Sequence, residues 1–449
     1  MLRSLFKAAI NMVKTAGQEG KDVLHKVASG RVEKPTTTAT AEGEAAAARA
    51  KKPKNRKYAL FLAYQGKNYF GMQVQSGMGT HQITIESKLL DAMLATGMIN
   101  EQQRHKFFDW HFQRAARTDR SVSAVRQVCS FYLPLEESFV DEAPKLLNEK
   151  LPADIRVLSL RRTVPSFHAQ KKCDYRTYSY TLPTFAFADV ESLTNAAFRL
   201  TPERLAEVND VLGLFVGTHN FFNYTSKKQH GDMSCNRYIV SFECGKPFTY
   251  THDIGLKKTE YEFATIYIKG QSFMLHQIRK MIGMTLTILR GFQHKSDLTR
   301  SFESQRMDVP RAPGLGLILE KVHYQCYDRQ FSKQHATLDD LGPEIESTLS
   351  GIRDELIIKE ILVTEAITSS MLLWLSDLPK HDFRAIAEDE GDERKSELPM
   401  AYAKANEAEK AVKEEEEDEE AAAGDDDGNE EVKTEAEVVQ EEEKIAVQA

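Results

Sequence analysis

CDYRTYSYTL, residues 173–182, alternates its side chains in the manner of a β-strand. Arg176, Tyr178 and Tyr180 point to one face of such a strand, and the residues between them point to the other. The segments on either side of this strand decide which class of sheet it joins.

Further strands and helices follow one another in an irregular order. Apolar runs bounded by turn residues predict strands at residues 58–64, 127–133, 155–160, 236–243, 260–269 and 317–324. Helical spacing predicts a helix between Thr84 and Gly97, one that opens at Pro202, one over 274–290, and one or two within 351–378. The sequence shows no internal repeat and no regular βαβ rhythm, which favours an α+β fold over a doubly wound α/β fold.

The charge of the chain is unevenly divided. Residues 401–449 hold 19 acidic residues and five Lys and Arg, a net charge of −14, whereas the whole chain carries −8. The other 400 residues therefore carry +6, and a mildly basic body suggests a polyanionic partner. The acidic segment has too little apolar surface to fold, which favours a solubilising disordered tail. Competition with nucleic acid for the basic surface is the less favoured alternative.

Cysteine spacing and apolar runs exclude several classes of protein. The five cysteines show no CxxC spacing, which argues against a structural zinc site and a disulfide framework and suits a reducing compartment. No apolar run reaches membrane-spanning length, so no membrane partner is expected.

The N-terminal segment carries two competing targeting signals. Residues 1–18 place apolar side chains on one helical face beside basic residues, as a mitochondrial presequence does, although a surface helix fits equally well. Residues 51–57, KKPKNRK, form a short basic cluster that suits nuclear import or RNA contact. The expected location is the nucleus, the mitochondrion or both.

These patterns divide the chain into five regions. They are a disordered or targeting segment (1–56), the N-terminal half of the catalytic body (57–165), its C-terminal half (166–335), a helical extension (336–400) and the acidic disordered tail (401–449).

QRAARTDRSVSAV, residues 113–125, sets a single acid, Asp119, among Arg114, Arg117 and Arg120. This aspartate is either the cap of a solvated turn or a reactive carboxylate held by its neighbours. The residues alone leave the capping interpretation ahead.

Arg279 shares a largely apolar helical face with Leu275 and Ile282. Burying a guanidinium without an anion costs several kcal/mol, which favours a carboxylate or phosphate partner over an arginine that reaches out to water. Asp119 is a candidate partner, because a paired carboxylate stays ionised as a nucleophile must. Tyr178 is either a core residue or a stacking platform for a flat base.

Five blocks, taken together and in order, resemble the TruA family of tRNA pseudouridine synthases, in its eukaryotic pseudouridine synthase 1 branch. The blocks are RAARTD (114–119), CDYRTYSYTLPTFAF (173–187), GTHNFFNYTS (217–226), KGQSFMLHQIRKMIG (269–283) and VPRAPGLGLILEKVHY (309–324). The resemblance covers about residues 57–331 and leaves out both ends of the chain.

The resemblance implies roles for four residues. Asp119 matches the family's aspartate nucleophile, Arg117 the arginine that helps to displace the target nucleotide, Tyr178 the tyrosine that packs against the uracil, and Arg279 the arginine that pairs with the carboxylate. It also implies the pseudouridine synthase fold, with two mixed α+β halves, an antiparallel sheet and a basic RNA-binding cleft between the halves. No metal or organic cofactor is implied. The expected partner is tRNA, with mRNA and other RNA as further candidates, and the chain is expected to be a monomer.

One residue departs from the family's pattern. The family usually has glycine two residues after the aspartate, where this chain has Ser121. If that glycine adopts a positive φ, Ser121 is strained there. The competing interpretations are an RNA-binding or chaperone protein that has lost catalysis and an N-glycosidase that releases uracil, and both rank behind the synthase.

Overall fold

The computed structural model describes residues 53–74, 83–192, 194–255, 257–381 and 383, which fall in one compact unit. Several predicted regions lie wholly or partly outside the described residues: the presequence-like segment, the first two residues of the basic cluster at 51–57, residues 382 and 384–400 of the helical extension, and the acidic tail. Among the described residues, no helix is long and apolar enough to cross a membrane.

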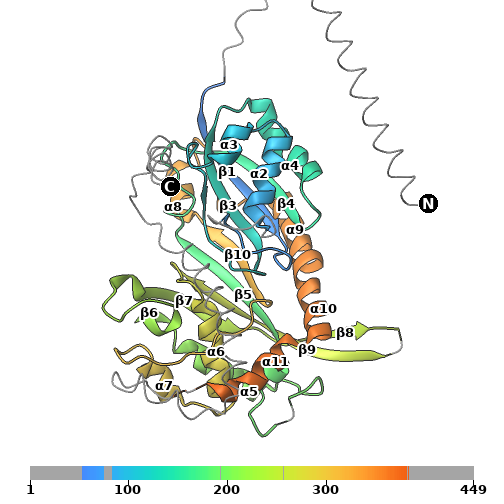
Figure 1. Cartoon of the computed structure of the whole chain (residues 1–449), viewed down its shortest axis with the longest axis vertical. Coiled ribbons are helices and arrows are strands. Elements are labelled where there is room, and N and C mark those ends of the chain that lie inside the picture. Colours follow the sequence, from blue (N-terminus) through green and yellow to red (C-terminus); the bar gives the residue numbers. More distant parts are fainter. Residues whose placement is uncertain (1–52, 75–82, 193, 256, 382, 384–449) are drawn as a thin grey trace, which may run out of the picture. The chain divides into compact units, whose positions relative to one another are not determined.

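A single ten-stranded sheet runs through both predicted halves (Figure 1). Its strands lie in the order β4-β1-β3-β10-β5-β9-β7-β6, with β2 paired to β3 and β8 paired to β9. Every pair is antiparallel except β10 with β3, so the predicted α+β class with antiparallel pairing is confirmed. The strand bounds are β1 (Arg56–Tyr64), β2 (Gln113–Arg114), β3 (Ser123–Leu133), β4 (Ile155–Arg162), β5 (Tyr175–Pro183), β6 (Gly217–Asn220), β7 (Asn236–Cys244), β8 (Phe248–Asp253), β9 (Lys258–Gly270) and β10 (Leu317–His323).

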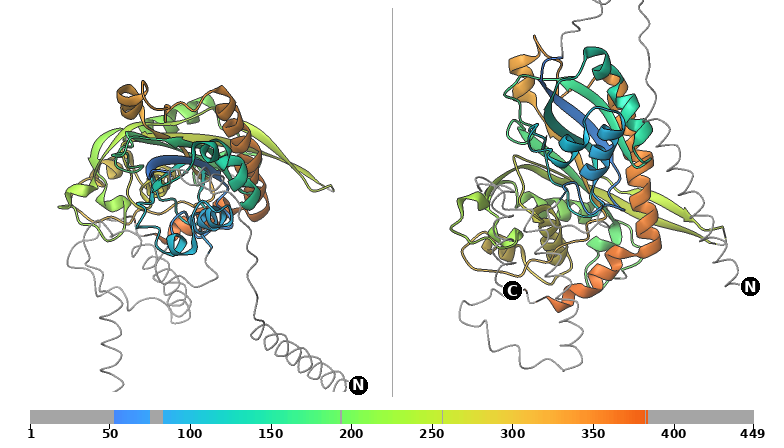
Figure 2. Two further views of the ribbon diagram at one scale, coloured as in Figure 1. Left: turned by 90° about the horizontal axis from the view of Figure 1, so that it is seen from above. Right: turned by 45° about the horizontal axis from the view of Figure 1, so that its top comes forward.

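The helices divide between the two ends of this sheet (Figure 1). Helices α2 (Ile85–Ala95), α3 (Glu101–His105) and α4 (Glu137–Lys150) lie at the end that holds β1, β3 and β4. Helices α5 (Pro202–Gly213), α6 (Gln277–Leu289) and α7 (Lys295–Arg300) lie at the other end, and α8 (Gln325–Phe331) follows β10. The β8–β9 hairpin projects from the body in each view (Figure 2).

The local signals for α2 and α5 are present in the structure. The Thr84 side chain accepts from the N–H of Ser87, and the Ser87 side chain accepts from the N–H of Thr84, which makes a capping box at the start of α2. Pro202 occupies the first turn of α5 after the Thr201 cap. The helix predicted over 274–290 begins later than predicted, at Gln277, because His276 has a φ of 61° and interrupts it.

The helical extension consists of α9 (Pro343–Gly351), a π-helical turn η4 (Ile352–Ile358), α10 (Lys359–Thr368) and α11 (Ser370–Asp377). It runs along one side of the molecule (Figures 1 and 2). Arg353 in η4 pairs with Glu320 of β10 at 3.0 Å, and Glu360 of α10 pairs with Lys67, beyond β1, at 2.6 Å. The extension therefore contacts strands and turns from both predicted halves.

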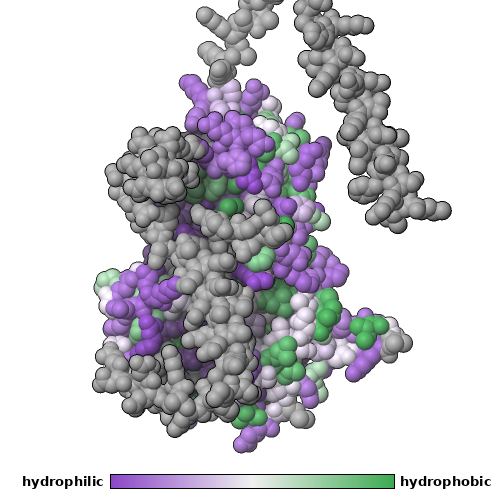
Figure 3. Space-filling model, viewed as in Figure 1, coloured by the Kyte–Doolittle hydropathy of each residue, from purple (hydrophilic) through white to green (hydrophobic). Residues whose placement is uncertain are grey.

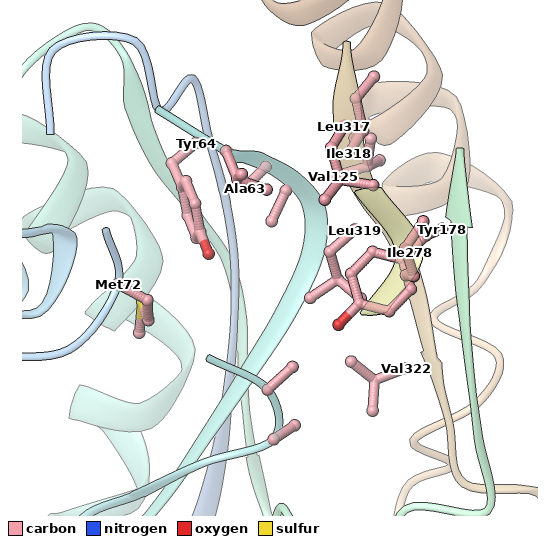
Figure 4. Close-up of a cluster of buried hydrophobic side chains, with 14 of the residues drawn as sticks. Ala63, Tyr64, Met72, Val125, Tyr178, Ile278, Leu317, Ile318, Leu319 and Val322 are labelled. Atoms are coloured by element: carbon pink, nitrogen blue, oxygen red, sulfur yellow. The ribbon is translucent and has the colours of Figure 1, made fainter. Parts of the chain in front are cut away.

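Strand β10 completes the core where the two ends of the sheet meet (Figure 4). Ile318 and Leu319 of β10 are fully buried near Val125 of β3 and Tyr178 of β5, and Tyr64 of β1 belongs to the same cluster farther along. Burying each aliphatic side chain of this size stabilises the fold by roughly 1.5–3 kcal/mol. This packing holds β3, which follows the loop of Asp119, and β5, which carries Tyr178, at a fixed separation.

Candidate active site

The loop 115–122 joins β2 to β3 and is held from several directions. The guanidinium of Arg176 on β5 donates to the carbonyl oxygen of Ala115 at 2.8 Å. The hydroxyls of Tyr64 and Thr118 lie 2.8 Å apart, and the N–H of Met72 donates to the carbonyl oxygen of Thr118 at 3.1 Å. These bonds fix the backbone on the N-terminal side of Asp119.

Ser121 fixes the other side of Asp119 in a left-handed turn with a φ of 65°. Its N–H donates to the carbonyl oxygen of Tyr69 at 3.2 Å, and its hydroxyl lies 3.4 Å from the carbonyl oxygen of Lys67. Nearby Gly71 has a φ of 88°, and a Cβ there would lie 2.8 Å from the carbonyl oxygen of Thr118. Residue 121 therefore has the positive φ that the sequence analysis considered, with a serine in place of glycine.

Asp119 points to residues that lie far away in the sequence. Its Oδ2 is 3.3 Å from Nδ1 of His276 and 3.7 Å from Nη1 of Arg279, and 16% of its side chain is exposed. The structure thus brings Asp119 and Arg279 within ion-pair distance. Their catalytic roles stay predictions, because geometry alone does not establish a reaction.

The environment of Asp119 favours the ionised carboxylate. Burial raises the pKa of this carboxyl, but the hydrogen-bond and charge interactions with His276, together with the charges of Arg279 and Arg311, outweigh burial and lower the pKa below its ordinary value. The group therefore carries its negative charge at neutral pH, as a nucleophile requires.

Arg279 is held by the loop 310–316 as well as by Asp119. Its Nε donates to the carbonyl oxygen of Ala312 at 2.7 Å, and the N–H of Ala312 donates back to the carbonyl oxygen of Arg279 at 3.1 Å. Helix α6 approaches this loop closely, since a Cβ at Gly283 would lie 1.9 Å from the carbonyl oxygen of Pro310. The guanidinium is thereby fixed before any substrate arrives.

His276 and Arg311 join the site although the sequence did not single them out for a role. Nη1 of Arg311 lies 2.8 Å from Nε2 of His276, whose other ring nitrogen faces Asp119. The one available signal was a histidine inside the apolar run FMLHQI, three residues before Arg279. A histidine in such a run is also compatible with an ordinary core position.

Tyr178 lies on β5 between β9 and β10, and only 7% of the residue is exposed. Its ring meets the ring of Phe273 edge to face, with the centroids 5.3 Å apart. Burial raises the pKa of Tyr178 well above its usual value, and the negative charge of Asp119 acts in the same direction. The tyrosine is therefore a neutral, largely buried aromatic surface close to the carboxylate.

The three arginines beside Asp119 in the sequence have different environments. Arg114 pairs with the fully buried Glu86 at 2.7 Å, and the Arg120 guanidinium lies 4.5 Å from the ring centroid of Phe70. Arg117 is exposed. Proximity in the sequence therefore does not give these arginines one common role, and the contacts of Asp119 with residues 276 and 279 reach across about 160 positions of the chain.

Among the described residues, no group of three or more His, Cys, Asp or Glu side chains is arranged to hold a metal ion. The donors around Asp119 are nitrogen groups of arginine and histidine, and arginine does not ligate metals. What the site offers is one carboxylate, fixed N–H donors and an aromatic wall.

The comparisons of this sequence with known proteins agree on one family. The family described as "tRNA pseudouridine synthase" matches residues 212–325. The "Pseudouridylate synthase 1 homolog" of Homo sapiens is 41% identical over 331 residues, which cover 73% of this chain and 74% of that protein. The Mus musculus protein of the same name is 41% identical over 335 residues, covering 74% and 76%. The "tRNA pseudouridine synthase 1" of Yarrowia lipolytica is 28% identical over 397 residues, covering 69% and 72%. Among solved structures, a Cas6 product complex aligns at 9% identity with a TM-score of 0.14, too low to carry an argument.

Proposed function

This chain belongs to the TruA-type family of tRNA pseudouridine synthases, and we propose that it isomerises specific uridines in tRNA to pseudouridine with Asp119 as the nucleophile. The observation that carries the assignment of Asp119 is its position. It lies in the RAARTD loop, is mostly buried, and contacts Arg279 from a helix distant in the sequence. An ionised carboxylate held beside a neutral aromatic ring suits attack on an unstacked nucleoside.

The reaction conserves every atom of the nucleotide. The N1–C1′ bond of uridine breaks, the base turns, a C5–C1′ bond forms, and the proton lost from C5 is balanced by a proton gained at N1. The carboxylate of Asp119 has two sites of attack open to it, C1′ of the ribose and C6 of the uracil. Either route requires a dry pocket, since water that reached the intermediate would release the base.

Tyr178 and Phe273 supply the apolar side of that pocket. Their edge-to-face contact leaves a rigid aromatic corner next to Asp119, against which a uracil ring packs in this proposal. Tyr178 is fixed by strand pairing on both sides of β5, so it orients the base without a large entropic cost.

We propose that the RNA lies in a basic cleft between the two ends of the sheet. Support comes from exposed Arg117 and Arg120 on the Asp119 loop and from exposed Lys227 on the segment after β6. Lys and Arg contacts with phosphates offset the few kcal/mol that extrusion of a base costs. In the view of Figure 3, hydrophilic residues predominate over much of the described surface, whereas hydrophobic residues gather near the β8–β9 hairpin.

The first test replaces Asp119 with Asn. Tritium release from tRNA that carries 5-³H-uridine is expected to fall by at least about a thousandfold, as for other covalent nucleophiles, with tRNA binding retained. Asp141→Asn, on the exposed face of α4, is the matched control and is expected to react at the wild-type rate. Turnover by the Asp119→Asn variant at the wild-type rate would reject the nucleophile assignment.

Digestion of the product RNA separates the competing functions. A synthase yields pseudouridine, an N-glycosidase yields an abasic site and free uracil, and an RNA-binding protein without catalysis yields unchanged uridine. The ionised state of Asp119 and its contact with Arg279 favour an enzyme over a protein that only binds RNA, and membership of the family favours the synthase over the N-glycosidase.

The wider assignments extend this proposal. We propose mRNA and other non-coding RNA as further substrates, the nucleus and the mitochondrion as locations, and a monomer as the active form. The two targeting signals near the N-terminus support the locations, and pseudouridine mapping in each compartment, with and without the protein, tests both substrates and locations.

A further inference from the structure

We propose that His276 is a positioning residue, which accepts a hydrogen bond from Arg311 through Nε2 and donates one through Nδ1 to Oδ2 of Asp119, with Oδ1 as the attacking oxygen. The inference rests on the proposed role of Asp119 as nucleophile. It assigns a function to His276, which is a buried histidine, and to Arg311, which is an arginine in a loop.

The contact with Arg311 decides the tautomer of the imidazole. A guanidinium has N–H donors and no acceptor, so at a separation of 2.8 Å Nε2 of His276 must present its lone pair. A neutral imidazole that accepts at Nε2 carries its proton at Nδ1. That proton faces Oδ2 of Asp119, 3.3 Å away.

The backbone at residue 276 is set to hold this arrangement. His276 is 4% exposed and has a left-handed conformation, φ 61° and ψ −3°, directly before α6. The carbonyl oxygen of His276 accepts from the N–H of Lys280, and the Gln277 side chain accepts from the N–H of Met274. A left-handed histidine is strained and persists only where its surroundings fix it, which is typical of functional sites.

The geometry gives the two carboxylate oxygens of Asp119 different tasks. His276 and Arg279 both contact Oδ2, so these two groups anchor the same oxygen. Attack is assigned to Oδ1, whose lone pairs neither of these two contacts uses. The hydrogen bond from Arg311 favours the neutral form of His276, so in this proposal the imidazole orients Oδ2 as a donor while Arg279 supplies the positive charge.

Within the part of the chain that the structure describes, four groups with charge or a titratable proton face the carboxylate or its partner: Arg279 from α6, Arg311 from the loop 310–316, His276 itself and Tyr178 from β5. Without the hydrogen bond from His276, only the charges of Arg279 and Arg311 oppose the effect of burial, so the pKa of Asp119 rises. The ionised fraction of Asp119 then falls at acid pH, so the acid limb of the rate profile moves to higher pH.

The matched pair His276→Asn and His276→Gln tests the inference. The Asn amide nitrogen occupies the place of Nδ1 and tolerates the left-handed backbone, whereas the longer Gln amide occupies the place of Nε2. His276→Asn is expected to keep the wild-type pH profile and to react within about threefold of the wild-type rate. His276→Gln is expected to lose about 10- to 100-fold in single-turnover rate and to shift the acid limb up by about one pH unit.

His276→Gly keeps the test valid if the Gln variant folds poorly, because glycine removes the side chain and relieves the backbone. It is expected to bind tRNA as the wild type does and to show the same shifted acid limb. A purely structural role would lower the rate by one factor at every pH. An unshifted acid limb in both the Gln and the Gly variants would overturn the proposal.

Nitrogen NMR of the ¹⁵N-histidine-labelled protein reads the tautomer directly. The signals lost in His276→Asn are expected to be those of a neutral ring protonated at Nδ1, and a ring protonated at Nε2 would overturn the proposal. The two hypotheses fail in different ways. An active Asp119→Asn variant would reject Asp119 as the nucleophile. An inactive Asp119→Asn variant, combined with His276 variants whose acid limb is not shifted, would reject only the role proposed for His276.

Discussion

Ser121 and His276 flank the carboxylate of Asp119 with two left-handed turns, and they do so for different reasons. The side chain of His276 contacts Asp119, so its conformation serves the proposed chemistry. The Ser121 hydroxyl reaches the carbonyl oxygen of Lys67 at 3.4 Å, while its N–H bond to Tyr69 is a backbone contact that any residue except proline can make. Strain at residue 121 is therefore separable from function, whereas strain at residue 276 is not.

Replacing Ser121 with Gly tests that separation. Glycine adopts a positive φ without strain, and the relief is expected to exceed its greater entropy in the unfolded chain by about 0.5 kcal/mol. Urea denaturation should therefore show a small gain in the free energy of unfolding, with tritium release unchanged. Ser121→Val is the matched control and is expected to lose about 1–2 kcal/mol, because a β-branched residue suits this conformation poorly. A less stable Gly variant would show that the Lys67 contact outweighs the strain.

Among the residues around Asp119, the sequence predicted the pairing that neutralises a buried charge, but it did not predict the role of His276. A buried Arg279 needs an anion, which led to Asp119, and the two side chains lie 3.7 Å apart. The contribution of His276 depends on one backbone angle and on Arg311 from a loop 35 positions further along the chain. No local pattern encodes either of these.

The elements were predictable where one local signal was strong. Thr84 before α2 and Pro202 in α5 mark helix starts that the structure reproduces. Helix α4 was not predicted, since Pro144 lies within it and its apolar residues are few. The start of α6 was placed three residues too early, because periodicity does not report the turn at His276.

The helical extension is attached to the body by an ion pair whose strength can be measured. Glu320 of β10 accepts from Ser179 at 2.6 Å and from Arg353 of η4 at 3.0 Å. Arg353→Met leaves this mostly buried carboxylate without its cation, and the free energy of unfolding is expected to fall by about 1–3 kcal/mol. The double variant with Glu320→Gln should recover part of the loss, as measured by urea denaturation.

Lys359→Met supplies the comparison within the same extension. Lys359 pairs with Glu355 at 3.1 Å, but both side chains are more than half exposed, so its removal is expected to change stability by less than about 0.5 kcal/mol. Equal effects of the two substitutions would show that the ion pair between η4 and β10 contributes no more to stability than an exposed ion pair does.

For the whole molecule, the sequence predicted the fold class and the family but not the order of the strands. Alternating segments such as 173–182 indicate that a sheet exists. They do not indicate that β10 inserts between β3 and β5, because that pairing depends on contacts between residues about 140 or more positions apart. The predicted division at residues 165 and 166 stays a prediction, since one sheet passes through both parts.

RNA binding is a property of the whole charged surface, and its salt dependence tests the proposed contribution of Arg117. Each phosphate contact adds about 0.9 to the slope of log affinity against log salt on duplex nucleic acid. Arg117→Ala is expected to lower that slope by about one and to weaken tRNA binding at low salt. Lys145→Ala, on the exposed side of α4, should leave the slope unchanged. An unaltered slope in Arg117→Ala would remove this arginine from the phosphate contacts.

The place of β10 has a consequence for biosynthesis. A ribosome delivers β1, β3 and β5 long before it delivers the strand that joins them, and β10 ends only at His323. Until that strand emerges, β3 and β5 lack the strand that pairs with both, so we expect Asp119 to take its place opposite Arg279, and RNA to be modified, only after β10 has been made. Maturation of the catalyst is thereby coupled to nearly complete translation of its body.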